Sequence, residues 1–214
     1  MQEFKTIKQN GVSEIVEKKS KFIGNIFYLE NKSEAEEIIK QMKKKYSDAR
    51  HNCYAYAILE NNTVITKSSD DGEPASTAGV PILSAIQENG LVNVLVIVTR
   101  YFGGILLGTG GLVRAYTKAT TEAIQNAGII EKELGYKIKF ATDYNKLEKL
   151  KYYLKQNLCS IIDVIYLEKI ELIAEVNEKI KIEIEKNNIN TNEMFEKAEI
   201  LENKYINKIS IWKK

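Results

Sequence analysis

Residues 70–116 read DDGEPASTAGVPILSAIQENGLVNVLVIVTRYFGGILLGTGGLVRAY, and this stretch decides how the whole chain is interpreted. It holds both prolines and eight of the twelve glycines, five of them within residues 103–111. Glycine loses more backbone entropy on folding than other residues and adds no packing, so such a cluster indicates positive-φ turns or a backbone that something approaches closely. The stretch therefore predicts a functional site or a very tight crossover.

Three regular elements are expected inside this stretch. Thr77 is expected to cap a helix that has Pro81 in its first turn and ends at an Asn-Gly pair. The β-branched run at residues 92–99 is typical of a central strand buried on both faces. A second helix, from about residue 110 to 126 and ended by Gly128, follows the glycine loop. Strand, glycine loop and helix in this order are typical of an anion-binding turn.

Outside the stretch, strand-period alternation and turn signals predict further elements. In the N-terminal half, Ser33 and Glu36 resemble a capping box for a helix to about Tyr46. The expected strands lie at residues 13–18, 21–29, 53–59 and 63–67, the last two joined by a turn at Asn61-Asn62. Beyond residue 135 the expected elements are a strand at 136–141, a helix capped by Thr142 or Asp143, a hairpin at 161–166 and 170–176, strand-like alternation of Ile180, Ile182 and Ile184, a loop at 187–192, and strands at 198–201 and 206–212.

This pattern predicts an α+β protein of two domains, residues 1–135 and 136–214, the second a small split β-α-β unit. A length of 214 residues with 44% hydrophobic and 28% charged residues is typical of a globular protein. The net charge of +2 is too small to attract polyanions, so any affinity for nucleic acid must come from local clustering. Cys53 and Cys159 form no C-x-x-C pair, and no leader or membrane span is visible, so we expect a cytoplasmic protein.

The glycine loop does not fit the common nucleotide motifs. No Gly-Lys follows at P-loop spacing, and a dinucleotide fingerprint starting at Gly108 would need glycine where Val113 stands. A phosphate turn of the small-molecule kinase type remains open, although the serines usual in such turns are absent. The cationic character of residues 89–121, which contain no carboxylate but do contain Arg100, Arg114 and Lys118, suits phosphate recognition.

The candidate anion or nucleic-acid site therefore consists of Arg100, Tyr101, Gly103, Gly104, Thr109, Gly110, Gly111 and Arg114. Arginines and helix amides would bind phosphates, and Tyr101, Phe102 and Tyr116 would stack on bases. The alternative is structural: the glycines make a strand-to-helix crossover and the aromatic residues belong to the core.

Acidic and nucleophilic residues offer further candidates. Asp70, Asp71 and Glu73 could hold Mg²⁺ or could cap the helix expected at Thr77. His51 and Cys53 share a strand face, which allows a Cys/His dyad or part of a metal site, as well as a purely structural role. No Ser-His-Asp or G-x-S-x-G pattern is present, so hydrolysis has little support.

The motifs now described resemble those of the Impact family, and its bacterial branch is the nearer match. The similarity lies in Ser20-Lys21-Phe22-Ile23, residues 49–56, residues 69–74, residues 77–83, residues 99–104 and residues 108–116, and it spans roughly residues 1–135. One departure is Ser76, where the family usually has glycine. The resemblance implies an N-terminal domain like domain 2 of ribosomal protein S5 and a C-terminal ferredoxin-like domain similar to domain V of elongation factor G. Eukaryotic relatives regulate translation through protein contacts, and bacterial members have no settled activity.

Three functions follow as hypotheses. The first is a non-enzymatic cytosolic regulator linked to translation that binds RNA or a ribosome-associated partner, with no cofactor, no membrane and no DNA sequence specificity. The second is a protein-interaction module with an aromatic hot spot of Tyr54, Tyr56, Tyr101 and Phe102. The third is a Mg²⁺-dependent enzyme that uses Asp70, Asp71 or Glu73 on a phosphorylated small molecule. Oligomeric state stays open.

Overall fold

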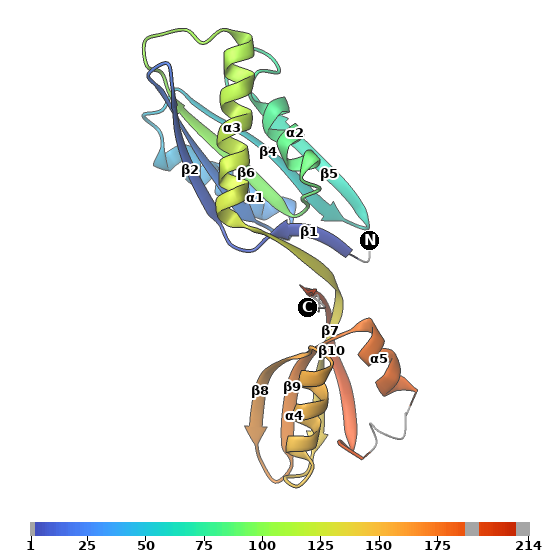
Figure 1. The fold of residues 1–214 in the computed structure, drawn as a ribbon. Helices are drawn as coiled ribbons and strands as arrows, with labels where there is room; N and C mark the ends of the chain where they lie inside the picture. Colours follow the sequence, from blue (N-terminus) through green and yellow to red (C-terminus); the bar gives the residue numbers. More distant parts are fainter. Residues whose placement is uncertain (1–2, 187–192, 209–214) are drawn as a thin grey trace, which may run out of the picture. The chain divides into compact units, whose positions relative to one another are not determined.

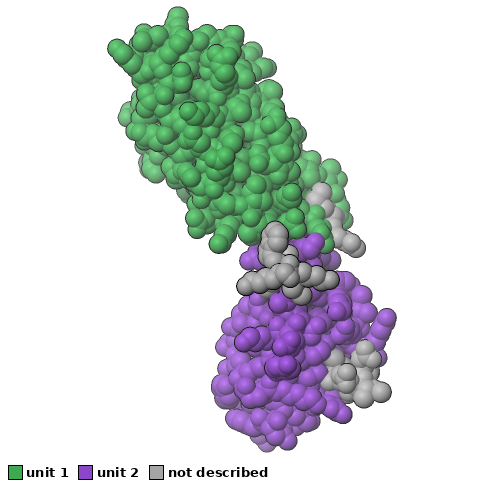
Figure 2. All heavy atoms as spheres, in the orientation of Figure 1, with its two compact units in different colours: residues 1, 3–131 green, residues 2, 132–214 purple. Residues whose placement is uncertain are grey.

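A computed structural model of the chain describes residues 3–186 and 193–208. The chain forms two compact units, one ending at Glu131 and the other beginning at Lys132 (Figure 2). Each unit contains helices packed on a sheet. The two-domain α+β class predicted from the sequence is confirmed. Among the described residues, no helix combines the length and the apolar character that crossing a membrane requires.

The N-terminal unit is built on an antiparallel sheet with strand order β2-β3-β6-β4-β5. The strands of this sheet are β2 (Gly11–Glu17), β3 (Ser20–Tyr28), β4 (His51–Glu60), β5 (Thr63–Ser69) and β6 (Val94–Tyr101), and the short strand β1 (Glu3–Ile7) lies outside it. Its helices are α1 (Lys32–Lys45), α2 (Gly79–Glu88) and α3 (Thr109–Ala127). The β-branched strand β6 lies in the middle of the sheet, as predicted.

Both faces of this sheet are covered, because successive residues of β6 point to opposite sides. Val94, Val96 and Val98 pack into the core formed with α2 and α3. Leu95 and Ile97 pack into the core formed with α1 on the other face (Figure 1). This arrangement explains the unbroken apolar run, since a strand exposed on one face would alternate with polar residues.

The turn between β4 and β5 forms as predicted, whereas the start of α1 does not. Asn61 and Asn62 both have positive φ, 49° and 62°, in the two-residue turn that joins β4 to β5. The start of α1 differs from the expected capping box. Asn31 Oδ1 accepts from Glu34 N at 3.0 Å, so the cap is Asn31, two positions before Ser33.

The C-terminal unit contains β7 (Ile129–Thr142), α4 (Leu147–Gln156), β8 (Ser160–Tyr166), β9 (Ile170–Asn177), α5 (Glu178–Glu185) and β10 (Lys197–Asn207). The order β10-β7-β9-β8, with all neighbours antiparallel, is that of a ferredoxin-like split β-α-β unit. The expected hairpin of β8 and β9 is confirmed. The end of α4 nearest β7 has no side-chain cap, so the caps expected at Thr142 and Asp143 are wrong.

The alternation of Ile180, Ile182 and Ile184 does not make a strand. These residues lie in α5, where Asn177 Oδ1 accepts from Ile180 N at 3.1 Å and caps the helix. Ile180 is buried, Ile184 packs on the same core, and Ile182 is exposed, which is the one-sided burial of a helix. The expected loop at residues 187–192 and the end of the last expected strand, residues 209–212, lie outside the described residues.

Candidate functional site

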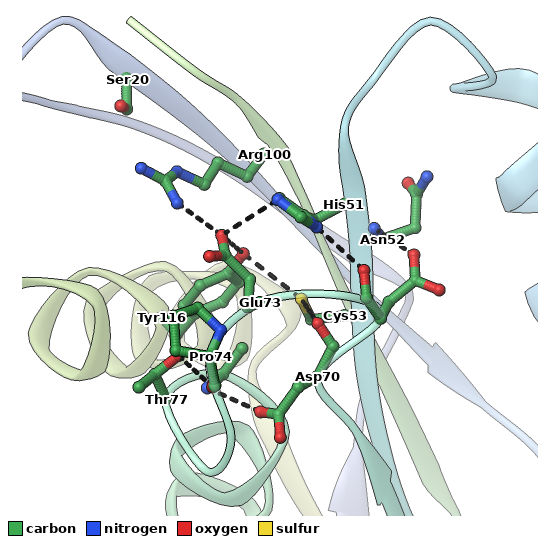
Figure 3. Close-up of polar contacts among 12 residues, drawn as sticks. Ser20, His51, Asn52, Cys53, Asp70, Glu73, Pro74, Thr77, Arg100 and Tyr116 are labelled. Atoms are coloured by element: carbon green, nitrogen blue, oxygen red, sulfur yellow. Dashed lines mark hydrogen bonds and ion pairs between the residues drawn. The ribbon is translucent and has the colours of Figure 1, made fainter. Parts of the chain in front are cut away.

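A buried ion pair lies at the centre of the site, beneath the glycine loop. Arg100 Nη1 donates to Glu73 Oε1 at 2.6 Å, and the two side chains are 7% and 3% exposed. The hydroxyl of Tyr116, from α3, donates to the same oxygen at 2.9 Å (Figure 3). The Nε2 atom of His51 lies 4.0 Å from Glu73 Oε1. Residues from β4, β6, α3 and the loop before α2 therefore meet at one carboxylate.

The role predicted for Arg100 changes accordingly. Its guanidinium was expected on a ligand phosphate, but the protein's own Glu73 takes that place. Its carbon Cζ lies 5.4 Å from the ring centroid of Phe22 and 5.6 Å from that of Phe102. Its Nε is buried and has no hydrogen-bond partner among the described residues. Arg100 is thus a fixed, charged part of the protein with donor capacity that the protein does not fully use.

Cys53 and His51 share a face of β4, as expected, but they do not form a dyad. Cys53 Sγ donates to the Asp70 carbonyl at 2.9 Å and lies 3.3 Å from Tyr116 Oη. His51 Nδ1 lies 2.9 Å from the Asp71 carbonyl, which can only accept, so this nitrogen carries the proton. Burial raises the pKa of the Cys53 thiol to about 12. Burial also raises the pKa of the Tyr116 hydroxyl, and the neighbouring Cys53 thiol adds to this effect. A thiol whose pKa is raised carries little thiolate, so Cys53 is not activated as a nucleophile, and Tyr116 serves as a hydrogen-bonding residue of the core.

Each of the three acidic residues of the loop, Asp70, Asp71 and Glu73, accepts hydrogen bonds from its own set of donors. Asp70 accepts from the backbone N–H groups of Ser76, Ala78 and Gly79 at 2.8 to 3.0 Å. Burial alone would raise the pKa of the Asp70 carboxyl, but these hydrogen bonds outweigh it and hold the pKa below its usual range. Asp71 pairs with Lys43 and accepts from Asn52 N at 2.7 Å.

The hydrogen bonds of this loop decide which residue caps α2 and whether the three carboxylates can share a cation. Asp70, and not Thr77, caps α2, because the Thr77 hydroxyl donates back to the Pro74 carbonyl at 2.7 Å. Since Asp70, Asp71 and Glu73 point to different donors, they do not converge on a cation. Within residues 3–186 and 193–208, no group of three or more His, Cys, Asp or Glu side chains could hold a metal ion.

Most of the loop glycines meet structural requirements. A Cβ on Gly103 would lie 2.0 Å from the Lys19 carbonyl carbon, and Gly103 N donates to Ser20 Oγ at 3.2 Å. The amide of Gly103 is therefore not available to a ligand, contrary to the prediction. Gly104 and Gly108 have positive φ, 82° and 74°. Gly110 is different, since a Cβ there would meet only Arg114 Nη1, at 3.8 Å.

The two arginines that flank the loop do not share a site. Arg100 lines a cavity of about 350 Å³ together with Arg50, His51, Glu73, Phe102 and Thr109. Arg114 lines a separate depression of about 230 Å³ with Lys18, Lys118 and Gly111. Leu107 lines both. The predicted site residues are thus divided between two neighbouring surfaces of one loop.

The aromatic residues are divided as well. Tyr116 is fully buried and edge-on to Phe22, so it cannot stack on a base. Tyr56 is buried beneath α1, and Tyr54 packs partly against the same core, which excludes one continuous aromatic hot spot. The hydroxyl of Tyr101 donates to Asp48 at 2.9 Å. Only Phe102 is both exposed and on the cavity wall.

Sequence reasoning missed Arg50 as a site residue. Arg50 is one of only three arginines in a chain with 31 basic residues, and this scarcity is the signal that could have found it. It stands next to His51 at the start of β4, whose backbone pairs with β6 at Arg100. Leu106, which is 81% exposed, was also not singled out, because an apolar loop residue carries no chemical signal.

The N-terminal unit is similar to a known domain over most of its length. The Impact N-terminal domain matches residues 18–124, and a domain of unknown function (DUF1949) matches residues 140–187. IMPACT family member YvyE of Bacillus subtilis (strain 168) is 41% identical over 174 residues, which cover 81% of this chain and 80% of that protein. The chain belongs to the Impact family. The resemblance to the bacterial branch is confirmed.

Further relatives match half or more of this Impact family member. An IMPACT family member of Haemophilus influenzae is 37% identical over 166 residues, 76% of this chain and 79% of that protein. IMPACT family member YigZ of Escherichia coli (strain K12) is 39% identical over 109 residues, 50% of this chain and 53% of its own. A crystal structure described as a hypothetical protein covers 94% of this chain and 97% of its own, with a TM-score of 0.61 and 26% identity. The two-domain architecture is therefore shared.

Proposed function

We propose that this Impact family member is a cytosolic regulator linked to translation that binds the RNA backbone, on ribosomal particles, through the surface beside α3. The link to translation is what the family resemblance implies. The RNA contact comes from the depression lined by Lys18, Arg114 and Lys118, which we name the cationic surface; Glu17 also lines it, so cations outnumber carboxylates there by three to one. Net charge does not suggest such binding, but this surface provides the local clustering that phosphate recognition needs.

Three cations that line one depression beside α3 carry this proposal. All three side chains are exposed, and none forms an ion pair at 4.0 Å or less within the described part of the chain. The cap of α3 is Gly108, without a side-chain hydrogen bond, and its first turn contains no acidic residue. Because Arg114 Nη1 lies 3.8 Å from the position of a Gly110 Cβ, its guanidinium folds back over that turn. Helix dipole and side-chain charges therefore act in the same direction.

Co-sedimentation with ribosomal particles tests the proposal. Wild type is compared with the double variant Arg114→Ala/Lys118→Ala at about 50 and about 200 mM salt. Over this range the affinity of a protein that binds phosphates falls steeply. We expect binding of the wild type to fall steeply with salt, and the slope of log K against log salt to lose about one for each cation removed. Both residues are exposed, so the variant folds normally.

The matched control is Lys40→Ala/Lys44→Ala, which removes the same charge from exposed positions of α1 on the opposite face of the sheet. Control and wild type should sediment alike. Salt-independent association, or equal losses in both double variants, would show that the cationic surface does not bind RNA.

A second function, docking of a protein partner, is favoured by one observation. Phe102, Ile105 and Leu106 of the glycine loop are exposed by 42%, 43% and 81%, which is unusual for three large apolar residues so close together. A partner held by this loop would stay bound after nuclease treatment and would be lost in Leu106→Asp. RNA binding predicts the opposite on both counts.

A further inference from the structure

The cavity beside the cationic surface has a composition that the proposed function does not use. Its volume is about 350 Å³, at the lower end of the range for small-molecule sites. Three separate segments line it: the start of β4, the loop before α2, and the chain from the end of β6 into α3. Segments distant in sequence thus converge on one concave surface with a charged wall and an apolar wall.

The charged wall has a surplus of positive charge. Arg100 and Glu73 neutralise each other in their buried pair, which leaves Arg50 as the remaining charged side chain of the lining. Arg50 is exposed and has no ion pair at 4.0 Å or less among the described residues. The side chain of Arg100 is more than nine-tenths buried, lines the same cavity, and keeps its Nε without a partner. The wall therefore suits an anion.

The first turn of α3 closes the cavity at Gly108 and Thr109. Its amides have no side-chain cap, and the Thr109 hydroxyl is available beside them. Gly110 adds an independent observation, because glycine is a poorer helix former than alanine while a Cβ there would meet no described atom closer than 3.8 Å. Among the residues that the structure describes, no contact requires a glycine at this position, whereas close approach of a bound group to the helix amides does.

The apolar wall consists of Phe102, Leu106, Leu107 and Leu112. One face of the Phe102 ring packs on the Arg100 guanidinium, and 42% of the residue is exposed. A planar ring can stack on such a surface, in the way that bases stack on aromatic side chains supported by arginine. The two walls together fit a ligand with a phosphate at one end and a flat ring at the other.

We propose that this cavity binds a nucleoside phosphate monoester, with the phosphate at Arg50 and the first turn of α3 and the base against Phe102. The same chemistry occurs in a free mononucleotide and in the 5′-phosphorylated end of an RNA strand. This site stands apart from the cationic surface, since only Leu107 lines both. Both sites border the first turn of α3, so they are separated by variants at side chains that line only one of them, Arg50 for the cavity and Arg114 with Lys118 for the cationic surface.

Calorimetric titration of the full chain tests this site. The probes are AMP and CMP, the matching nucleosides, inorganic phosphate, and one short RNA with either a 5′-phosphate or a 5′-hydroxyl. We expect the monophosphates to bind at least about tenfold more tightly than either the nucleosides or inorganic phosphate, because charge-assisted hydrogen bonds and ring stacking both contribute. Tighter binding of the 5′-phosphorylated RNA than of both the 5′-hydroxyl RNA and AMP identifies an RNA end as the ligand, because the 5′-hydroxyl RNA measures binding at the cationic surface alone. Tighter binding of AMP, with equal affinity for the two RNAs, identifies the free nucleotide.

Two variants separate ligand binding from folding. Arg50→Ala removes an exposed, unpaired cation, and Thr109→Glu places a carboxylate where the phosphate would lie. A glutamate in the first turn favours the helix dipole, so Thr109→Glu should keep or raise the thermal midpoint while it weakens AMP binding by about tenfold or more. The control Gln125→Glu adds the same charge at an exposed position near the other end of α3 and should bind AMP like the wild type.

The proposal is overturned if neither AMP nor CMP binds with a dissociation constant below about 10 mM, because such weak binding is too weak for a specific site. It is also overturned if Arg50→Ala and Thr109→Glu both bind AMP as tightly as the wild type does. Equal affinity for inorganic phosphate and AMP would remove the nucleoside from the assignment and overturn it in this form. Failure of ribosome co-sedimentation alone does not bear on this site, because that assay depends on Arg114 and Lys118.

Discussion

At the scale of single residues, the most consequential contact is the buried pair of Arg100 and Glu73. Two charges at 2.6 Å with almost no exposure are retained only because each compensates the other and Tyr116 donates a further hydrogen bond. The pair also holds the loop before α2 against the end of β6. Removal of either charge leaves the other buried without a counter-ion.

This pairing predicts strong coupling between the two positions. Arg100→Met and Glu73→Gln should each lower the free energy of unfolding by about 3–5 kcal/mol, whereas the double variant should lose less than the sum of the two. Urea unfolding of all four proteins gives the coupling energy. Additive losses would show that the charges do not compensate each other in the folded protein.

At the scale of elements, α2 and α3 begin in opposite ways. The start of α2 is satisfied from within the chain, because the Asp70 carboxylate accepts from three amides at that end. The start of α3 has neither a side-chain cap nor an acidic residue. The difference marks α2 as a closed structural element and α3 as the element whose amides face the proposed ligand.

Asp70→Ala should therefore cost about 1–2 kcal/mol of stability at neutral pH, the usual magnitude for a helix cap. The pKa of Asp70 in the folded protein lies below its unfolded value, so the stabilisation is complete above about pH 4 and disappears as pH falls through the folded pKa. Unfolding curves of wild type and variant should converge in acid. Asp70→Asn, which keeps an acceptor without the charge, should be intermediate, and an equal difference at every pH would contradict the assignment.

The two loop glycines Gly103 and Gly110 provide a matched pair of substitutions. Gly110→Ala should raise the free energy of unfolding by about 0.5–1 kcal/mol, because alanine favours the helix and its Cβ has space. Gly103→Ala should lower it by about 1–3 kcal/mol, because its Cβ would overlap the Lys19 backbone. Thermal unfolding checks both signs. A destabilised Gly110→Ala variant would mean that the fold itself needs this glycine.

At the scale of the whole molecule, the described residues form hydrophobic cores that belong to one unit or the other. The N-terminal unit has a core on each face of its sheet, and the C-terminal unit has a single core that includes Phe140, Leu150 and Leu172. Since no core cluster mixes residues of both units, each unit has its own source of stability.

Leu172→Ala should accordingly destabilise the C-terminal unit by about 2–5 kcal/mol and leave the N-terminal unit unchanged. Hydrogen exchange followed by mass spectrometry resolves the two, with faster exchange expected in β7 to β9 and unchanged exchange in β6 and α3. Equal acceleration in both units would show that they unfold together.

The sequence alone was sufficient where the determining interactions are local. The β-branched run at residues 92–99 predicts a strand buried on both faces, and β6 lies at the centre of the covered sheet. Asn61 and Asn62 adopt positive φ readily, and Gly128 ends α3 for the same reason. The alternation of β8 and β9 likewise follows from residues that are neighbours in the chain, and so do the family motifs that identified the two-domain fold.

The tertiary structure alone decided which groups compensate each other. Glu73 reaches Arg100 across 27 positions of sequence, and Asp70 reaches the start of α2 because the intervening loop folds back. The same applies to α5, where the Asn177 cap and burial of Ile180 outweigh a strand-like alternation. Propensity and spacing act over a few residues, whereas the burial of a charge is stabilised only by the partner that the complete fold brings to it. Arg100 is therefore a structural residue, and Arg50 is a cation without an ion pair among the described residues, a distinction that no local pattern contains.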